Sequence, residues 1–147
     1  MYAALNEAEI ASEQNEIPIG AVVVKDNKII GRGHNQTELL KDNTAHAEMI
    51  AITAAGNHLN SKILEGCDLY VTVEPCVMCV GAILLTKIKN LYFGAFEPKF
   101  GACGSVYNII DKNKYNHRVK VFSNILESES QNLLKEYFIK KRTTKKK

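Results

Sequence analysis

Residues 67–79, CDLYVTVEPCVMC, hold the junction from which the fold of this chain can be predicted. The first seven of them alternate in polarity and are rich in β-branched and aromatic side chains, which favours a strand. A Glu-Pro pair ends that strand, and its proline is tolerated in the first turn of the apolar helix that residues 76–86 predict. Cys76 and Cys79 would share one face at the start of this helix, where the partial positive charge of the N-terminus favours thiolates.

Helices and strands alternate on both sides of this junction. Before it, the pattern predicts a helix over residues 2–15, a hairpin of strands 17–24 and 29–34, and a helix over 45–57 that Thr44 caps. After it, we expect a strand over 88–93, a short helix near 106–110, a strand over 118–122 and a terminal helix with a capping box at Ser128 and Gln131. This order indicates an α/β layer fold with a mixed sheet.

Length and composition favour one globular domain. The chain has 147 residues, of which 46% are hydrophobic and 24% charged, which is ordinary for a globular protein. The sequence shows neither a signal-peptide pattern nor an apolar run of membrane-spanning length, so we expect a cytoplasmic protein without membrane association. Thiols stay reduced in that compartment. Cys67 and Cys103 have no partner at motif spacing and are expected to be small buried hydrophobes.

The net charge of +3 is unevenly distributed along the chain. Residues 135–147 contain seven Lys or Arg residues and one Glu, a local charge of +6, whereas the remaining residues together carry −3. A basic terminus on an acidic body suggests a polyanionic partner. A solvated tail that merely aids solubility would have the same composition, so the charge pattern leaves both interpretations open.

His46 joins the two cysteines of the junction as a third candidate metal ligand. Zinc prefers four tetrahedral ligands drawn from Cys sulfur and His nitrogen, and a catalytic site keeps one position open for water. His46, Cys76 and Cys79 supply three donors, and a fourth does not occur at motif spacing. A zinc ion held there would therefore be catalytic rather than structural. It would lower the pKa of its water, so that hydroxide forms at neutral pH.

Glu48 is the one carboxylate adjacent to a candidate ligand. It could take the water's proton and deliver it later to a leaving group. His46 and Glu48 are two residues apart, a spacing that does not share a face in a regular helix. Either His46 precedes the helix in a non-helical conformation or Glu48 reaches around, and the spacing leaves both open. Ala47, between them, would contribute to substrate binding through its backbone.

A Cys-x-x-Cys pair alone is also found in redox proteins and as half of a structural zinc site. Those sites do not require a His-x-Glu sequence about thirty residues earlier, and a second Cys-x-x-Cys pair does not occur in this sequence. The sequence HAE at residues 46–48, followed by PCVMC at residues 75–79, instead matches the signature of zinc nucleobase deaminases.

The chain resembles the bacterial tRNA adenosine deaminases, which convert the first anticodon adenosine of a tRNA to inosine. The likeness covers nearly the whole chain in order and includes residues 17–22, 33–35, 44–48, 74–81, 93–95, 101–105 and 116–119. The resemblance implies a cytidine-deaminase-like three-layer α/β/α sandwich with a mixed five-stranded sheet. It implies one domain over residues 1–142, followed by a basic, disordered tail at 143–147. It also implies a homodimer with one Zn2+ per subunit, in which zinc-bound hydroxide attacks the purine and Glu48 shuttles protons.

The resemblance further implies roles for residues outside the signature. Asn35 matches the asparagine that hydrogen-bonds the flipped base, although the residue by itself would suggest a loop-capping role. The segments that contact the anticodon stem-loop contain Glu97, Lys99, Phe138, Lys140, Lys141 and Arg142. Glu97 and His34 stand where the family commonly has Asp and Trp. For Phe138 the alternative is core packing, because it falls on an apolar stripe of the terminal helix with Leu133, Leu134 and Tyr137.

Three functional interpretations follow from these patterns. The favoured one is zinc-dependent hydrolytic deamination of adenosine in a tRNA anticodon stem-loop. A deaminase of a free nucleobase or nucleoside (guanine, cytosine or cytidine) on the same fold would not need the basic terminal helix. A non-catalytic zinc module that only binds RNA would not need Glu48.

Overall fold

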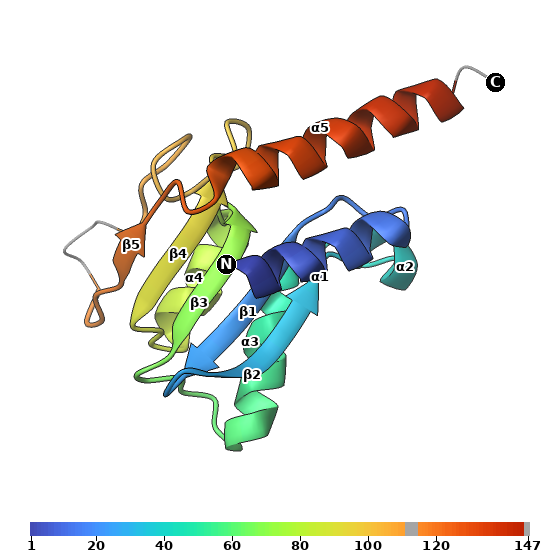
Figure 1. The fold of residues 1–147 in the computed structure, drawn as a ribbon. Coiled ribbons are helices and arrows are strands. Elements are labelled where there is room, and N and C mark those ends of the chain that lie inside the picture. The colour runs from blue at the N-terminus through green and yellow to red at the C-terminus, as the bar shows by residue number, and fades with distance from the viewer. Residues whose placement is uncertain (111–114, 146–147) are drawn as a thin grey trace.

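The computed structural model describes residues 1–110 and 115–145, in which five strands form one sheet (Figure 1). The strands are β1 (Gly20–Lys25), β2 (Lys28–His34), β3 (Asp68–Val73), β4 (Asn90–Ala95) and β5 (Lys120–Phe122). Their order in the sheet is β2-β1-β3-β4-β5. β1 pairs antiparallel with β2 and β3, whereas β3, β4 and β5 run parallel. The mixed sheet expected from the sequence is therefore confirmed.

Helices cover both faces of this sheet. They are α1 (Tyr2–Glu13), α2 (Thr37–Leu40), α3 (Ala47–Leu59), α4 (Val77–Leu85) and α5 (Glu127–Thr144). α1 and α5 lie on one face and α3 and α4 on the other, which produces the expected three-layer α/β/α arrangement (Figure 1). The second half of α5 extends beyond the sheet. Within the described residues, no helix is both long and apolar enough to cross a membrane.

Small residues bring α3 close to the sheet. Ala47, Ala51 and Ala55 are spaced one turn apart and are fully buried. They pack against Gly31 and Gly33 of β2, where a Cβ atom would clash with the carbonyl oxygens of Ala51 and Ala47. Because close-packed interiors leave no room for such an atom, these glycines fix the position of the first turn of α3.

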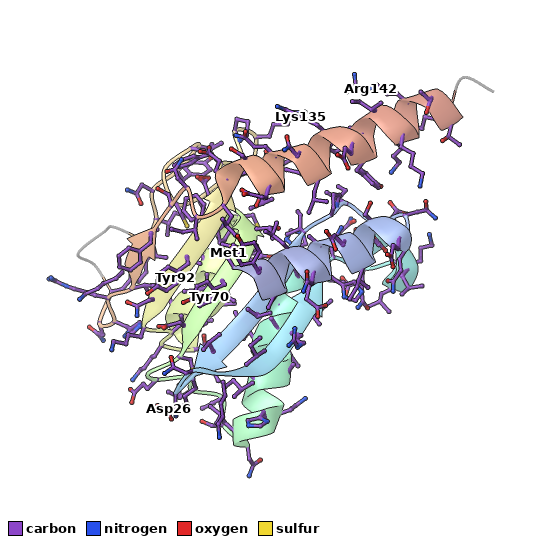
Figure 2. All side chains as sticks on the ribbon, in the orientation of Figure 1. Met1, Asp26, Tyr70, Tyr92, Lys135 and Arg142 are labelled. Carbon is purple, nitrogen blue, oxygen red and sulfur yellow. The ribbon has the colours of Figure 1, made fainter. Side chains whose placement is uncertain are left out.

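Stacked aromatic rings cross the three parallel strands. Tyr70 of β3 lies in register with Tyr92 of β4, with ring centroids 4.5 Å apart and ring planes 6° from parallel. Tyr92 stacks in turn on Phe122 of β5 at 4.8 Å. Figure 2 shows Tyr70 and Tyr92 side by side on the sheet. Cross-strand pairs of this kind stabilise a sheet and keep the short edge strand β5 in register.

Large side chains of the central strands pack in one core cluster with residues of α3 and α4. Leu69, Leu91 and Phe93 are fully buried there. Cys67 and Cys103 join the same cluster with 0% and 9% of their surface exposed. Both cysteines therefore pack as the small buried hydrophobes that the sequence predicts.

Residues 106–110 form a loop, so the short helix expected there is wrong. The backbone N–H groups of Val106 and Tyr107 both donate to the carbonyl of Gly101, and Cys103 forms an isolated antiparallel bridge with Asn108. Gly104 has φ +140°, a conformation that favours glycine and allows the chain to reverse. The segment therefore folds back on residues 101–103 instead of winding into a helix.

Both helix caps expected from the sequence are wrong. The Thr44 hydroxyl donates to Asp42 Oδ1 at 2.7 Å, and the N-cap of α3 is His46. α5 begins after Leu126, which has the left-handed backbone conformation, so Ser128 lies inside the helix, and Gln131 Nε2 donates to Glu127 Oε1 at 3.3 Å. A capping side chain accepts hydrogen bonds from backbone N–H groups, whereas Thr44 and Gln131 each donate to a nearby carboxylate.

α5 continues through Thr144, so Thr143 and Thr144 of the expected tail are helical. Their hydroxyls both donate to the carbonyl of Lys140 at 2.8 Å. Acidic residues in the first turn and basic residues in the last turn complement the helix dipole. Lys146 and Lys147 of the expected tail lie outside the described residues.

Candidate active site

The three candidate metal ligands lie together, although 30 residues separate His46 from Cys76 in the sequence. His46 Nδ1 is 3.7 Å from Cys76 Sγ and 3.6 Å from Cys79 Sγ. Their donor atoms all lie within 4.8 Å of one another, which is the separation expected for ligands of a single ion. The described residues thus contain a His-Cys-Cys cluster that fits a tetrahedral metal with one position left open.

Two helix starts create this cluster. His46 is the N-cap of α3, with φ −74° and ψ 152°, and Cys76 is the N-cap of α4, with φ −78° and ψ 175°. Both ligands are therefore extended and precede their helices, whereas Cys79 lies in the first turn of α4. The partial positive charge at the two N-termini favours anionic ligands. His46 thus takes the first of the two arrangements that its spacing from Glu48 had left open.

Glu48 lies in the first turn of α3 with 4% of its surface exposed. Burial raises the pKa of its carboxyl to about 7. A carboxyl with that pKa both accepts and donates protons readily near neutral pH. The sequence predicts Glu48 as a proton shuttle, and the burial of its side chain beside the cluster is compatible with that role.

The two thiols of the cluster differ in acidity. Contacts with Cys79 and with His46 lower the pKa of Cys76 to about 4. The neighbouring Cys76 and burial raise the pKa of Cys79. The contact with Cys76 also raises the pKa of His46. A metal ion bound by both sulfurs would therefore release the proton of Cys79, since coordinating thiols are deprotonated.

A cavity of about 610 Å³ opens beside the cluster. Its lining includes the ligands His46 and Cys76. It also includes five other residues that the sequence predicts for the site: Asn35, Ala47, Glu48, Glu97 and Phe138. The chain therefore brings residues from five separate segments to one concave surface, as a site for a small ligand or a single base requires.

The predicted RNA-contacting residues divide between the cavity and the surface. Phe138 lines the cavity and is 41% exposed, whereas Tyr137 is the buried aromatic of α5 at 7%. Core packing is therefore wrong for Phe138. Lys99, Lys140 and Arg142 lie on the exposed surface, away from the cavity lining. Lys141 is also at the surface, but its Nζ donates to the Tyr137 hydroxyl at 3.0 Å, which ties it to the body of the protein.

Several cavity residues were missed at the sequence level: Thr37, Asn43, Glu74, Phe100 and Leu134. Glu74 directly precedes Pro75, and this adjacency to the cysteine motif was a signal that could have identified it. Its Oε1 accepts a hydrogen bond from Ser105 Oγ at 2.8 Å, while Gly101 packs against Oε2 so closely that a Cβ atom would clash there. Phe100 and Leu134 gave no such signal, because only the tertiary fold brings them to the cavity.

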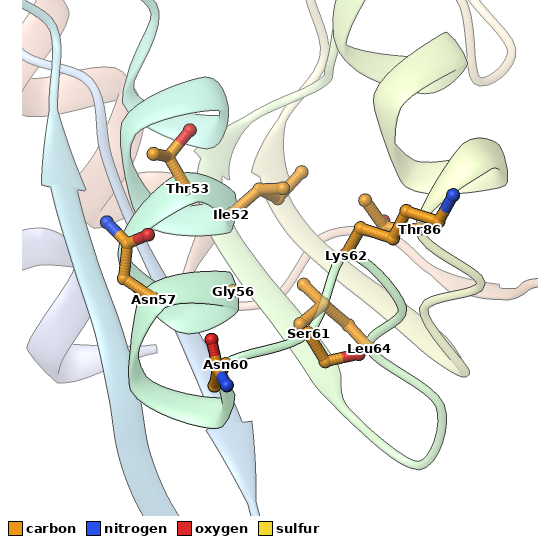
Figure 3. Close-up of a pocket in the computed structure, with 9 residues that line it drawn as sticks. All are labelled: Ile52, Thr53, Gly56, Asn57, Asn60, Ser61, Lys62, Leu64 and Thr86. Atoms are coloured by element: carbon orange, nitrogen blue, oxygen red, sulfur yellow. The ribbon is translucent and has the colours of Figure 1, made fainter.

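A second pocket of about 550 Å³ lies at the C-terminal end of α3 (Figure 3). Polar side chains such as Asn57, Ser61 and Lys62 surround a small apolar floor. The nine described residues that line it include no acid, histidine or cysteine, so this pocket lacks the groups for acid–base or metal chemistry.

Three comparisons with known proteins agree with this geometry. The family model of the MafB19-like deaminases matches residues 1–142. The tRNA-specific adenosine deaminase of Aquifex aeolicus (strain VF5) is 51% identical over 139 residues, which cover 95% of this chain and 91% of that protein. The tRNA-specific adenosine deaminase of Bacillus subtilis (strain 168) is 43% identical over 146 residues, covering 99% of this chain and 91% of that protein.

Solved structures show the same relationship. A structure from a study of A-to-I editing by tRNA:A34 deaminases at the wobble position of transfer RNA superposes with a TM-score of 0.87 at 46% identity, covering 91% of this chain and 97% of that one. Guanine deaminase from Bacillus subtilis superposes with a TM-score of 0.65 at 34% identity, covering 81% and 79%. By its family model, its sequence relatives and its fold, the chain belongs to the deaminase family of the tRNA-specific adenosine deaminases.

Proposed function

We propose that this chain deaminates adenosine to inosine at the first, wobble position of a tRNA anticodon, consuming water and releasing ammonia. One observation carries the proposal. The buried Glu48 carboxyl lies beside the His46, Cys76 and Cys79 cluster on the wall of a cavity that Phe138 also lines. The related tRNA-specific adenosine deaminases support the choice of substrate.

We propose zinc as the metal, one ion per subunit. One imidazole and two thiols form a donor set that zinc prefers, and the distances among His46, Cys76 and Cys79 fit a single ion. When bound, zinc supplies a Lewis acid that lowers the pKa of a water molecule to about 7. The chemistry of the donors also suits zinc, because both sulfurs lie at the start of α4, where the positive end of the helix favours thiolates.

Glu48 carries the proton transfers in this proposal. Its carboxylate accepts a proton from the attacking water and returns it to the purine ring nitrogen. A second transfer through the same carboxyl protonates the leaving amine, which departs as ammonia. A pKa of about 7 suits both directions of transfer, because neither protonation state is strongly favoured at neutral pH.

The base is held by other groups that line the same cavity. Asn35 is 5% exposed, and its backbone N–H donates to the carbonyl of Ile19 at 3.0 Å, so its side-chain amide projects from a fixed backbone. An amide offers both a donor and an acceptor to a base edge. Ala47 lines the cavity between His46 and Glu48 and offers its backbone. Phe138 offers an aromatic face on which a neighbouring base of the loop stacks.

A second candidate function is deamination of a free base. The 34% identical guanine deaminase of Bacillus subtilis favours it, because the same fold serves a free base in that protein. Two features of α5 favour RNA instead. Phe138 is exposed at the cavity, and Lys140 and Arg142 continue the same helix beyond the sheet.

We also propose that the protein is a cytoplasmic homodimer. The α4 sequence VMCVGAILL is apolar throughout, yet Val77 is 49% and Leu85 79% exposed. An apolar helix face of this kind is stabilised when a second copy covers it. Sedimentation of the wild-type protein and of Leu85→Glu tests this interface. A dimer that becomes a monomer on substitution supports it, and a wild-type monomer contradicts it.

The function is tested with two anticodon stem-loops that differ only in adenosine or guanosine at the first anticodon position. Purified protein should convert the adenosine to inosine, detected by mass, and leave the guanosine loop, free adenosine, free cytidine and free guanine unchanged. Brisk turnover of free guanine with an unchanged stem-loop would establish the second candidate instead. Zinc content, measured on the same sample, should be about one ion per chain.

A further inference from the structure

Glu16 is a wholly buried carboxylate in the connection between α1 and β1. Its backbone is held by the end of α1. Asn15 has φ 62°, and the Glu16 N–H donates back to the carbonyl of Ala11 at 2.9 Å, which is the bonding pattern of a left-handed helix stop. The direction in which the Glu16 side chain leaves the backbone is therefore fixed.

The Glu16 carboxylate binds the first turn of α2. It accepts hydrogen bonds from the backbone N–H groups of Leu39 at 2.6 Å and Glu38 at 3.1 Å, and Thr37 Oγ1 lies 3.5 Å away. These N–H groups have no partner inside a helix start, so a residue 22 positions earlier supplies the cap. The charge of the carboxylate also matches the positive end of the helix.

Apart from this cap, α2 is held through the chain beside it, where the Gln36 N–H donates to the carbonyl of Ala45 at 3.0 Å. Thr37 is half-buried, while Glu38, Leu39 and Leu40 are exposed, so burial of apolar surface contributes little. Gln36 is the N-cap residue of α2, but within the described residues its side chain makes no capping hydrogen bond to the helix. The free N–H groups of the first turn of α2 therefore depend on Glu16 for their hydrogen bonds.

The same turn also holds α5. The Tyr137 hydroxyl donates to the carbonyl of Asn15 at 2.9 Å and accepts from Lys141 Nζ at 3.0 Å. Asn15 and Glu16 thus bind two different elements through adjacent groups. The backbone carbonyl of Asn15 holds α5, and the side chain of Glu16 holds α2.

These two elements form two walls of the active-site cavity. Asn35, Thr37 and Asn43 come from α2 and the chain on either side of it, and Leu134 and Phe138 come from α5. We propose that Glu16 is a positioning residue, which sets the distance between these walls and thereby the affinity for the RNA loop. This inference rests on the proposed function. Glu16 touches neither the metal ligands nor Glu48, so it acts on binding and leaves the chemical step unchanged.

Glu16→Gln tests the proposal in the full-length zinc-loaded protein. An amide nitrogen would replace one carboxylate oxygen and face a backbone N–H, so one hydrogen bond is lost and two donors are opposed. We expect KM for the adenosine stem-loop to rise about tenfold while kcat stays within about twofold, since hydrogen bonds to charged groups have effects of this size. Amide hydrogen exchange over residues 37–41 should quicken, and exchange over residues 47–59 should not.

Glu13→Gln is the matched control, because Glu13 is an exposed carboxylate on the last turn of α1. It should leave KM and exchange unchanged. If Glu16→Gln does not fold, Glu16→Asp decides, because it keeps the charge but is one methylene shorter, so its carboxylate no longer reaches the N–H groups of Glu38 and Leu39 and KM should rise in the same sense.

Each remaining outcome has a definite meaning. A wild-type enzyme that leaves the stem-loop unconverted overturns the proposed function and this role together. If the wild-type enzyme converts the stem-loop, the positioning role alone is overturned when Glu16→Gln, or in its place Glu16→Asp, keeps the wild-type KM. Faster exchange in Glu16→Gln without a rise in KM would show that Glu16 holds α2 but does not position RNA, which also overturns the proposal.

Discussion

His46 and Glu48 face the same metal cluster although only Ala47 separates them. His46 is extended at φ −74° and ψ 152° and ends the chain that precedes α3, while Glu48 lies inside the first turn of the helix. The change from extended to helical backbone between them turns both side chains toward Cys76 and Cys79. A ligand and a proton carrier can thus lie two residues apart without sharing a regular helix face.

Glu48→Ala should abolish turnover while leaving the metal bound. Glu48 is not one of the three candidate ligands His46, Cys76 and Cys79, so its loss would remove the proposed proton carrier and leave those ligands in place. We expect kcat for the stem-loop to fall by about 10³-fold. Zinc content by elemental analysis should remain about one per chain. Glu65→Gln, an exposed carboxylate, serves as the control, and a fully active Glu48→Ala enzyme would refute the assigned role.

Cys79→Ser should remove the metal. In the proposed site three protein donors would hold zinc, and a hydroxyl replaces one thiolate poorly. We expect the bound zinc to fall well below one per chain and activity to fall with it, and dialysis against a chelator should have the same effect on the wild-type protein. Cys67→Ala is the matched control, because Cys67 is buried in the core away from the cluster. Full zinc retention by Cys79→Ser would contradict the ligand set.

Local patterns in the sequence predict the cysteine pair of the cluster and the layered fold. The spacing between Cys76 and Cys79, and the alternation of polarity over residues 67–73, are local patterns that local backbone geometry turns into structure. His46, 30 positions before Cys76, enters the prediction through its chemistry, because zinc needs a third donor. The extended conformation of His46 could not be predicted, since its spacing from Glu48 fits two backbone arrangements.

The features that sequence analysis missed depend on contacts between distant segments. α2 is four residues long, and its cap comes from Glu16, so no local pattern indicates it. Phe100 and Leu134 reach the cavity only because the loop after β4 and the start of α5 fold over the site. In the sequence Lys141 cannot be distinguished from its basic neighbours Lys140 and Arg142. In the structure its ammonium group donates a hydrogen bond to the hydroxyl of Tyr137.

Gly33→Ala should destabilise the protein. An added Cβ would clash with the backbone carbonyl of Ala47, which cannot move aside as a flexible side chain could. We expect the free energy of unfolding, measured by urea denaturation, to fall by about 1–3 kcal/mol. Lys28→Ala on the same strand is the control, because Lys28 is exposed. Equal stability of the two variants would contradict the close packing of α3 on β2.

Lys140→Ala and Arg142→Ala should each weaken RNA binding without changing stability. Both side chains are exposed on the part of α5 that extends beyond the sheet, and Arg142 is visible there in Figure 2. If each meets one phosphate, the slope of log K against log salt concentration should fall by about 0.7 to 0.9. Lys28→Ala, beside the Asp26 turn at the opposite end of the molecule, is the control (Figure 2). An unchanged salt slope in both α5 variants would contradict RNA contact there.

Lys141→Ala should differ from its neighbours. Its Nζ donates to the Tyr137 hydroxyl, which itself binds Asn15, so the substitution removes a support of α5 as well as a positive charge. We expect a loss of about 1 kcal/mol in the free energy of unfolding in addition to weaker RNA binding. Lys140→Ala, measured beside it by the same denaturation, should show no such loss. Equal unfolding energies for the two variants would show that the hydrogen bond to Tyr137 contributes nothing.

Phe138→Ala should raise KM for the stem-loop, because the ring is 41% exposed at the cavity and is free to stack on a base. Stacking on an aromatic ring contributes about 1–3 kcal/mol per base, so KM should rise at least about fivefold. Phe138→Leu distinguishes stacking of the ring on a base from exclusion of water by an apolar side chain. Leucine fills a similar space without an aromatic face, so a KM near that of Phe138→Ala indicates stacking, and a wild-type KM shows that the ring only excludes water. Thermal stability should change little in either variant, because the buried Tyr137 carries the packing of this turn.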